Sequence, residues 1–177
     1  MKNAFYLNPK LSVKAGRGVV LLAAAFVMTM AGAAELVLND IRNVTGYTTY
    51  KSDTIISGTG GFLVKDGGTL RFNEDAAFAN TFSGGVVIEE GGILEARQWN
   101  TTGTPFGTGP IELQCTGQKS TYIQFSRFAV PQTVTTTGDS TATYPAFRTV
   151  YSGTTLQGVV VGGDLYMDAT YADGKDN

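Results

Sequence analysis

Histidine is absent from this 177-residue chain, cysteine occurs once, and charged residues make up only 16% of it. Without histidine the chain cannot build the Ser-His-Asp or Cys-His arrangements that activate a nucleophile, nor most zinc sites. It also has no Walker phosphate loop and no dinucleotide-binding fingerprint. We therefore predict no catalytic residue, no cofactor and no metal site, and we do not expect an enzyme.

The single cysteine, Cys115, excludes an internal disulfide. Because no histidine is present to activate its thiol, we expect a small core residue on a strand. An intermolecular disulfide or a reactive thiol is the alternative.

Acidic residues are missing from the first 33 positions, which hold four of the 13 basic residues. This basic stretch leads into an apolar run, Val19–Ala31, that is shorter than the ~20 residues of a membrane-spanning helix. Small residues follow in the A-x-A pattern of signal peptidase. We predict a signal peptide over residues 1–33, and an uncleaved membrane anchor is the alternative. The residues of the cleavage site are Ala31 and Ala33, with cleavage after Ala33, and Ala34 is the second choice.

The remainder, residues 34–177, has nine basic residues against 15 acidic ones, a net charge near −6. Because Lys and Arg on phosphates dominate nucleic-acid binding, a nucleic-acid partner is not expected. We also predict no transmembrane segment here, and we expect this part of the chain to be exported.

A period of 24 residues relates Gly60–Phe72 (GGFLVKDGGTLRF) to Gly84–Ala96 (GGVVIEEGGILEA). Two glycine pairs, an apolar triplet and a charged pair recur at the same positions. The pattern returns at Gly162–Met167, which resembles Gly67–Phe72 at an offset of 95, one short of four periods.

Each unit contains short runs with the alternation of strands, separated by glycine. Such a unit cannot bury its apolar face alone, but stacked units share a continuous core. We predict an all-β fold, a right-handed parallel β-helix of about six coils over 34–177, with no helix in this region. An antiparallel sandwich is the alternative. The glycines predicted at the turns are Gly60, Gly61, Gly67, Gly68, Gly84, Gly85, Gly91, Gly92, Gly107, Gly109, Gly162 and Gly163.

These residues resemble the autotransporter-associated β-strand repeat. The family's glycine-rich core stands here as Leu63–Leu70, its Asn-x-aromatic-Ser-Gly-Gly segment as Asn80–Gly85, its Gly-x-Leu as Gly91–Leu94, and its closing segment as Phe106–Leu113. The resemblance is specific over Gly58–Leu113 and loose over the irregular coils 114–177.

The resemblance implies the passenger β-helix of a secreted or surface-displayed protein, at the outer membrane or outside a Gram-negative-type cell. In that family the repeats form a stalk ahead of a C-terminal barrel, which 114–177 does not resemble, so we expect a fragment of a longer chain. The expected function is a structural and interaction module of a stalk or adhesin. Its expected partners are a host surface, a glycan or an extracellular protein, and bare solenoid ends allow self-association.

A carbohydrate-binding or carbohydrate-active β-helix is the alternative function. The acidic pairs Glu89–Glu90 and Glu74–Asp75 are adjacent on strands or turns, where neighbours point apart, so they do not predict a catalytic pair. Asp164 and Asp168 are expected to be solvated turn acids. Trp99 lies in a polar loop and is the candidate ligand contact; otherwise it covers the end of the core.

Overall fold

Parallel strands make up the regular structure that the computed structural model describes, which covers residues 33–73, 77–96, 102–126, 129–151 and 155–168. Strands from distant parts of the chain pair in parallel throughout these ranges. The predicted all-β parallel β-solenoid is confirmed, with about five turns of ~24 residues. The antiparallel sandwich is therefore wrong for this part of the chain.

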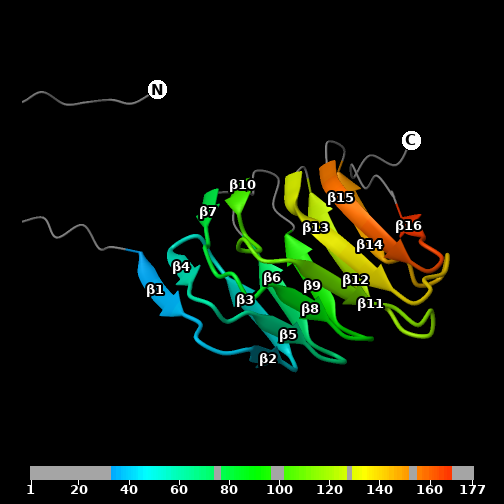
Figure 1. The fold of residues 1–177 in the computed structure, drawn as a ribbon, viewed down its shortest axis with the longest axis horizontal. Helices are drawn as coiled ribbons and strands as arrows, with labels where there is room; N and C mark the ends of the chain where they lie inside the picture. The colour runs from blue at the N-terminus through cyan, green and yellow to red at the C-terminus, as the bar shows by residue number, and fades with distance from the viewer. Residues whose placement is uncertain (1–32, 74–76, 97–101, 127–128, 152–154, 169–177) are drawn as a thin grey trace, which may run out of the picture. The chain divides into compact units, whose positions relative to one another are not determined.

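Three short strands make each of the early coils, and the later coils merge two of them into one longer strand (Figure 1). The strands are β1 Ala34–Val37, β2 Arg42–Val44, β3 Tyr47–Tyr50, β4 Thr54–Ser57, β5 Phe62–Val64, β6 Thr69–Phe72, β7 Ala77–Ala79, β8 Val86–Ile88, β9 Ile93–Ala96, β10 Thr102–Thr104, β11 Ile111–Gln114, β12 Tyr122–Ser126, β13 Ala129–Thr137, β14 Phe147–Tyr151, β15 Thr155–Gly162 and β16 Met167–Asp168.

The strands stack into two six-stranded sheets and a shorter third side. The first sheet has the order β15-β13-β11-β8-β5-β2, and the second has the order β16-β14-β12-β9-β6-β3. The third side consists of the pairs β1-β4 and β7-β10, and of the first residues of β13 and β15, which also pair. In Figure 1 the strands of each sheet follow one another in chain order, from the blue end of the colour bar toward its red end. Each sheet has six strand levels, and the solenoid has about five turns, where the sequence predicts about six coils.

Strand pairing shows the 24-residue period directly. Leu70 pairs with Leu94, and Phe62 pairs with Val86, so the two stretches compared in the sequence lie in register one above the other. The period varies elsewhere: Leu94 pairs with Ile123, 29 residues further on, because the connection between β11 and β12 is longer.

The register that the sequence predicts for the last coil is wrong by two residues. Through successive pairings, Val161 lies in register with Val64, and Met167 lies in register with Leu70, an offset of 97 rather than 95. Gly162 consequently ends strand β15 instead of forming a turn. A slip of two residues keeps every side chain on the same face of its strand, so apolar alternation alone does not reveal it.

The core is a set of columns in which like positions of successive coils stack. Phe62, Val86, Ile111 and Val134 form one fully buried column in the first sheet. Leu70, Leu94, Ile123 and Phe147 form the corresponding column in the second sheet. Most described aromatic residues fill this core, but Tyr47 and Tyr166 are exposed.

Phe72 lies at the centre of the aromatic part of this core. It is fully buried, and its ring centroid lies 5.9 Å from that of Tyr50 and 5.7 Å from those of Phe78 and Phe106. These contacts join three coils, because the four aromatic residues come from β3, β6, β7 and the corner after β10.

We expect Phe72→Ala to lower the free energy of unfolding by about 3–5 kcal/mol, because it removes a large buried side chain and leaves a cavity. Chemical denaturation followed by circular dichroism measures this change. Val37→Ala is the control: Val37 is 52% exposed, and its truncation should cost less than about 0.5 kcal/mol. Equal losses for the two variants would contradict the stacked core.

Candidate functional site

The predicted turn glycines lie where the coils bend or touch. Among them, Gly67, Gly85, Gly91 and Gly107 have positive φ angles between 70° and 83°, which other residues rarely adopt. Gly85 requires glycine for two reasons: its φ angle is positive, and a Cβ there would collide with the carbonyl oxygen of Pro110 in the next coil. A Cβ would likewise meet neighbouring backbone at Gly60, Gly61, Gly68, Gly84, Gly92, Gly109 and Gly163.

The predicted cleavage site borders the first strand. Ala33 is exposed, and Ala34 begins β1, where its N–H donates to the carbonyl oxygen of Asp53 at 2.8 Å. Cleavage after Ala33 would leave β1 whole, whereas cleavage after Ala34 would remove its first residue. Ala31 and the candidate ligand contact Trp99 lie outside the described residues.

Buried amides hold the corner between the third side and the first sheet. Asn80 is fully buried, and its Oδ1 accepts from the N–H of Ile56 at 2.9 Å while its Nδ2 donates to the carbonyl oxygen of Pro105 at 2.9 Å. Thr104 adds a bond from its Oγ1 to the carbonyl oxygen of Asn80 at 2.7 Å. One side chain thus ties three successive coils together, a role that sequence reasoning did not assign.

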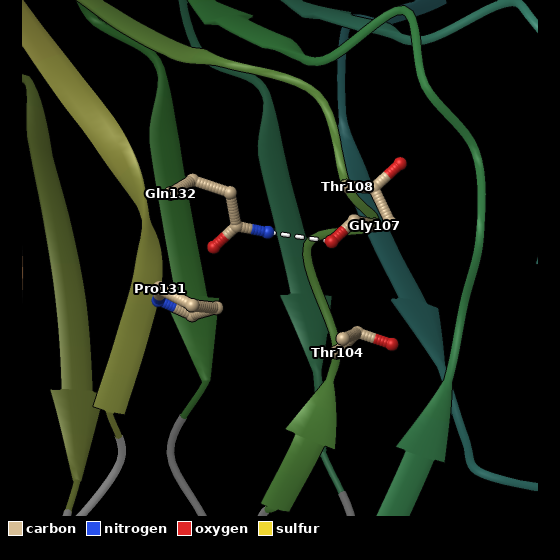
Figure 2. Close-up of a pocket in the computed structure, with 5 residues that line it drawn as sticks. All are labelled: Thr104, Gly107, Thr108, Pro131 and Gln132. Atoms are coloured by element: carbon tan, nitrogen blue, oxygen red, sulfur yellow. Dashed lines mark hydrogen bonds between the residues drawn. The ribbon is translucent and has the colours of Figure 1, made fainter.

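A small surface pocket of about 240 Å³ lies at the same corner, between the next two coils (Figure 2). There the long corner after β10 meets β13, which runs through the corner with a register shift between Val130 and Thr133. The five residues that line the pocket carry no charge: Thr104, Gly107, Thr108, Pro131 and Gln132.

Within this pocket, the side chain of Gln132 has a hydrogen-bond acceptor without a donor. The residue is only 8% exposed, and its Nε2 donates to the carbonyl oxygen of Gly107 at 2.6 Å, as Figure 2 shows. Its Oε1 is buried and has no hydrogen-bond partner, in contrast to Asn80, whose amide is satisfied on both sides. A buried acceptor without a donor is costly, so a hydroxyl donor at this position would be stabilising.

Charged side chains pair along the outside of the coils rather than gathering into a cleft. Arg71 Nε lies 2.6 Å from Glu95 Oε2, and Lys65 Nζ lies 2.9 Å from Glu89 Oε1; both pairs join residues 24 apart. The two pairs differ in burial, because the side chain of Glu95 is 5% exposed and that of Glu89 is 35% exposed.

The other carboxylates singled out in the sequence lie at separate places in the fold. Glu90 accepts a hydrogen bond from the hydroxyl of Thr116, whereas Glu89 pairs with Lys65. The two carboxylates therefore do not converge on a common position. Asp164 is exposed in the connection before β16, whereas Asp168 belongs to that strand and pairs in register with Arg148. The pair Glu74–Asp75 lies outside the described residues.

Lys119 belongs to the long connection between β11 and β12 and reaches back two coils. Its Nζ lies 2.6 Å from Asp66 Oδ2, and this hydrogen bond and charge raise the pKa of Lys119. Within the same connection, Thr121 Oγ1 accepts from the N–H of Gly91 at 2.7 Å. The longer loop is therefore fastened onto the two preceding turns.

Cys115 is buried, and it is not in a disulfide. Burial raises the pKa of its thiol to about 11. A thiol protonated at neutral pH is a poor nucleophile, which agrees with the core role that the sequence predicts. The predicted place on a strand is wrong, because Cys115 lies one residue beyond the end of β11.

Two further findings concern the described residues alone. They include no group of three or more His, Cys, Asp or Glu side chains placed to hold a metal ion. They also include no helix with the length and apolar character needed to cross a membrane.

We expect Glu95→Gln to cost about 3 kcal/mol in the free energy of unfolding, because it leaves the Arg71 guanidinium, 20% exposed, without its buried counter-charge. Glu89→Gln is the matched control; its pair with Lys65 is partly solvated and should contribute less than about 1 kcal/mol. Urea denaturation of both variants measures the difference. Similar losses for the two would show that burial does not govern these ion pairs.

A scan against protein-family models, a search of curated proteins and a search of solved structures each found no match to this chain. The resemblance to the autotransporter-associated β-strand repeat therefore stays a prediction at the level of the family. The parallel β-solenoid that it implies is present, with about five turns.

Proposed function

We propose that the chain is a structural and interaction module of an exported, surface-displayed stalk or adhesin, with no catalysis of its own. The observation that carries this proposal is the unbroken core that runs through the strand levels of both sheets. In a solenoid each coil contacts only its neighbours, so a continuous column transmits rigidity from one coil to the next. Such a stack suits a spacer that holds a binding surface away from its point of attachment.

Contacts between coils reinforce the stack in the way a spacer requires. The Arg71–Glu95 pair, in which the carboxylate is buried, joins two coils, and the doubly bonded Asn80 joins three. The side chains of these residues already have partners within the stack, so they are unsuited to acid–base chemistry on a substrate.

The proposed location rests on the N-terminal sequence pattern. A basic segment, an apolar run too short to span a membrane and an A-x-A sequence precede β1 directly. An exported module of this kind would meet a host surface, a glycan or an extracellular protein.

We expect the chain, expressed from its first methionine in a Gram-negative bacterium, to be exported and to begin with Ala34-Glu35-Leu36. Export separates the chain from the cytoplasm, and cleavage after Ala33 keeps β1 intact. Amino-terminal sequencing of the exported chain and protease treatment of intact cells measure processing and surface display. Replacing Ala33 by a bulky residue, Ala33→Leu, should block processing. An unprocessed cytoplasmic chain would count against the proposal.

Carbohydrate binding is a second candidate function, and the pocket around Gln132 favours it. The pocket is lined by Thr104 and Thr108, whose hydroxyl groups donate to the carbonyl oxygens of Asn80 and Phe82 and can still accept, by the ring of Pro131, and by Gln132, whose Oε1 is an unmet acceptor. A site without charge suits a neutral polyhydroxylated ligand, such as a sugar unit, better than a phosphate or an amine.

We expect millimolar glucose, galactose or N-acetylglucosamine to shift the backbone amide resonances of Thr104, Thr108 and Gln132 in NMR titrations. Gln132→Leu should remove the shifts, because it removes the acceptor. Gln114→Leu is the matched control, since Gln114 donates to Glu112 away from the pocket. Shifts that persist in Gln132→Leu, or none in the native chain, would exclude this site.

A further inference from the structure

Residues 115–121, the connection between β11 and β12, form a strap along the side of the stack. Cys115 at its start is 6% exposed and Thr121 at its end is 2% exposed, so both ends of the strap are buried. Between them the side chains of Thr116 and Lys119 are exposed. A segment that is fixed at both ends and solvated in the middle can open locally, without unfolding the strands beside it.

Two exposed bonds hold the middle of the strap onto the turns of the two preceding coils. Lys119 Nζ lies 2.6 Å from Asp66 Oδ2, which belongs to the turn between β5 and β6. The hydroxyl of Thr116 donates to Glu90, which belongs to the turn between β8 and β9. The strap therefore spans three consecutive coils, its own included.

The two acids beneath the strap are stacked like charges. Asp66 and Glu90 occupy equivalent positions of adjacent coils, because Val64 pairs in register with Ile88. Such residues repel each other unless a positive charge lies beside them. The hydrogen bond and charge of Asp66 and, to a smaller extent, the charge of Glu90 raise the pKa of Lys119. One lysine thus partly neutralises both acids, which favours the closed strap.

The middle and the end of the strap respond differently to ionic strength. The side chains of Lys119 and Asp66 are 50% and 63% exposed, and salt screens exposed ion pairs. At the buried end, Thr121 Oγ1 accepts from the N–H of Gly91 at 2.7 Å, and neither group is charged. Salt therefore acts on the ion pair, and the Gly91–Thr121 bond breaks only when the strap opens.

We propose that residues 115–121 are a salt-sensitive latch, in which Lys119 holds the strap over Asp66 and Glu90 and so locks three coils of the solenoid together. At low ionic strength the latch is closed. As salt screens the charges, the strap opens more often, and its contacts across the three coils are lost. This inference goes beyond the proposed spacer function, and its failure would leave that function standing.

Amide hydrogen exchange of the exported full chain tests the latch, followed by NMR at about 20 mM and about 500 mM sodium chloride. The reporter is the N–H of Gly91, which donates to Thr121. The internal control is the N–H of Gly92, which donates to the carbonyl oxygen of Glu89 within its own turn at 2.8 Å. We expect the higher salt to speed the exchange of Gly91 about two- to fivefold relative to Gly92, the range of an exposed ion pair.

Lys119→Ala should speed the exchange of Gly91 by a similar factor at low salt and abolish its response to salt. Lys65→Ala is the matched control, because it removes the same charge from a pair with Glu89 outside the strap, and it should leave the response of Gly91 unchanged. Circular dichroism checks that both variants keep the strand spectrum.

Three results would overturn the latch. The first is a Gly91 exchange rate in the native chain that does not respond to salt. The second is an unchanged salt response in Lys119→Ala, which would show that another contact holds the strap. The third is exchange of Gly91 and Gly92 that rises together, which would show that salt opens the whole turn rather than the strap.

Discussion

Vertical stacking of like side chains is the constraint on which this structure depends. Parallel strands of successive coils lie ~4.8 Å apart, so each inward residue packs directly on its counterpart in the coil below. The column from Phe62 through Val86 and Ile111 to Val134 shows how little variation this permits, because each member is apolar and fully buried. No coil has a core of its own, so the stability of each depends on its neighbours.

Connections between strands can change length because they lie outside the columns. The step from Leu94 to Ile123 takes 29 residues, yet both side chains remain in one column. The extra residues form the loop that contains Lys119, which reaches back to Asp66. Register is therefore preserved by the strands, while the loops absorb insertions and supply additional contacts between coils.

The amino-acid sequence predicts the parts of the fold that follow directly from stacking. The 24-residue period, the glycine corners and the parallel solenoid could all be predicted, because each leaves a repeated pattern. The ion pairs carried a signal that was missed: Lys65 and Glu89, like Arg71 and Glu95, are opposite charges one period apart. The register of the last coil could not be predicted, since a two-residue slip preserves the alternation of faces.

Sequence reasoning was weakest at the corner amides. Asn80 was recognised as part of a motif, but its bonds to Ile56 and Pro105 depend on which coils lie above and below it. Gln132 has no counterpart at a fixed spacing, because β13 passes through its corner without a long turn. A single residue at a variable spacing leaves no periodic signal, so only the three-dimensional structure identifies the pocket.

One unsatisfied polar group and several exposed apolar side chains lie where a corner or a column loses its neighbour. Gln132 lies where a long corner is followed by a short one, and its Oε1 is left without a donor. Val161 and Met167 lie where the described columns end, and their apolar surface is left exposed. Along the sides of the stack, the apolar faces are buried in the columns, and Lys65, Arg71, Glu89 and Glu95 form ion pairs between coils. Recognition of a ligand is therefore expected at the interrupted corner, and substitutions along the columns should act mainly on stability.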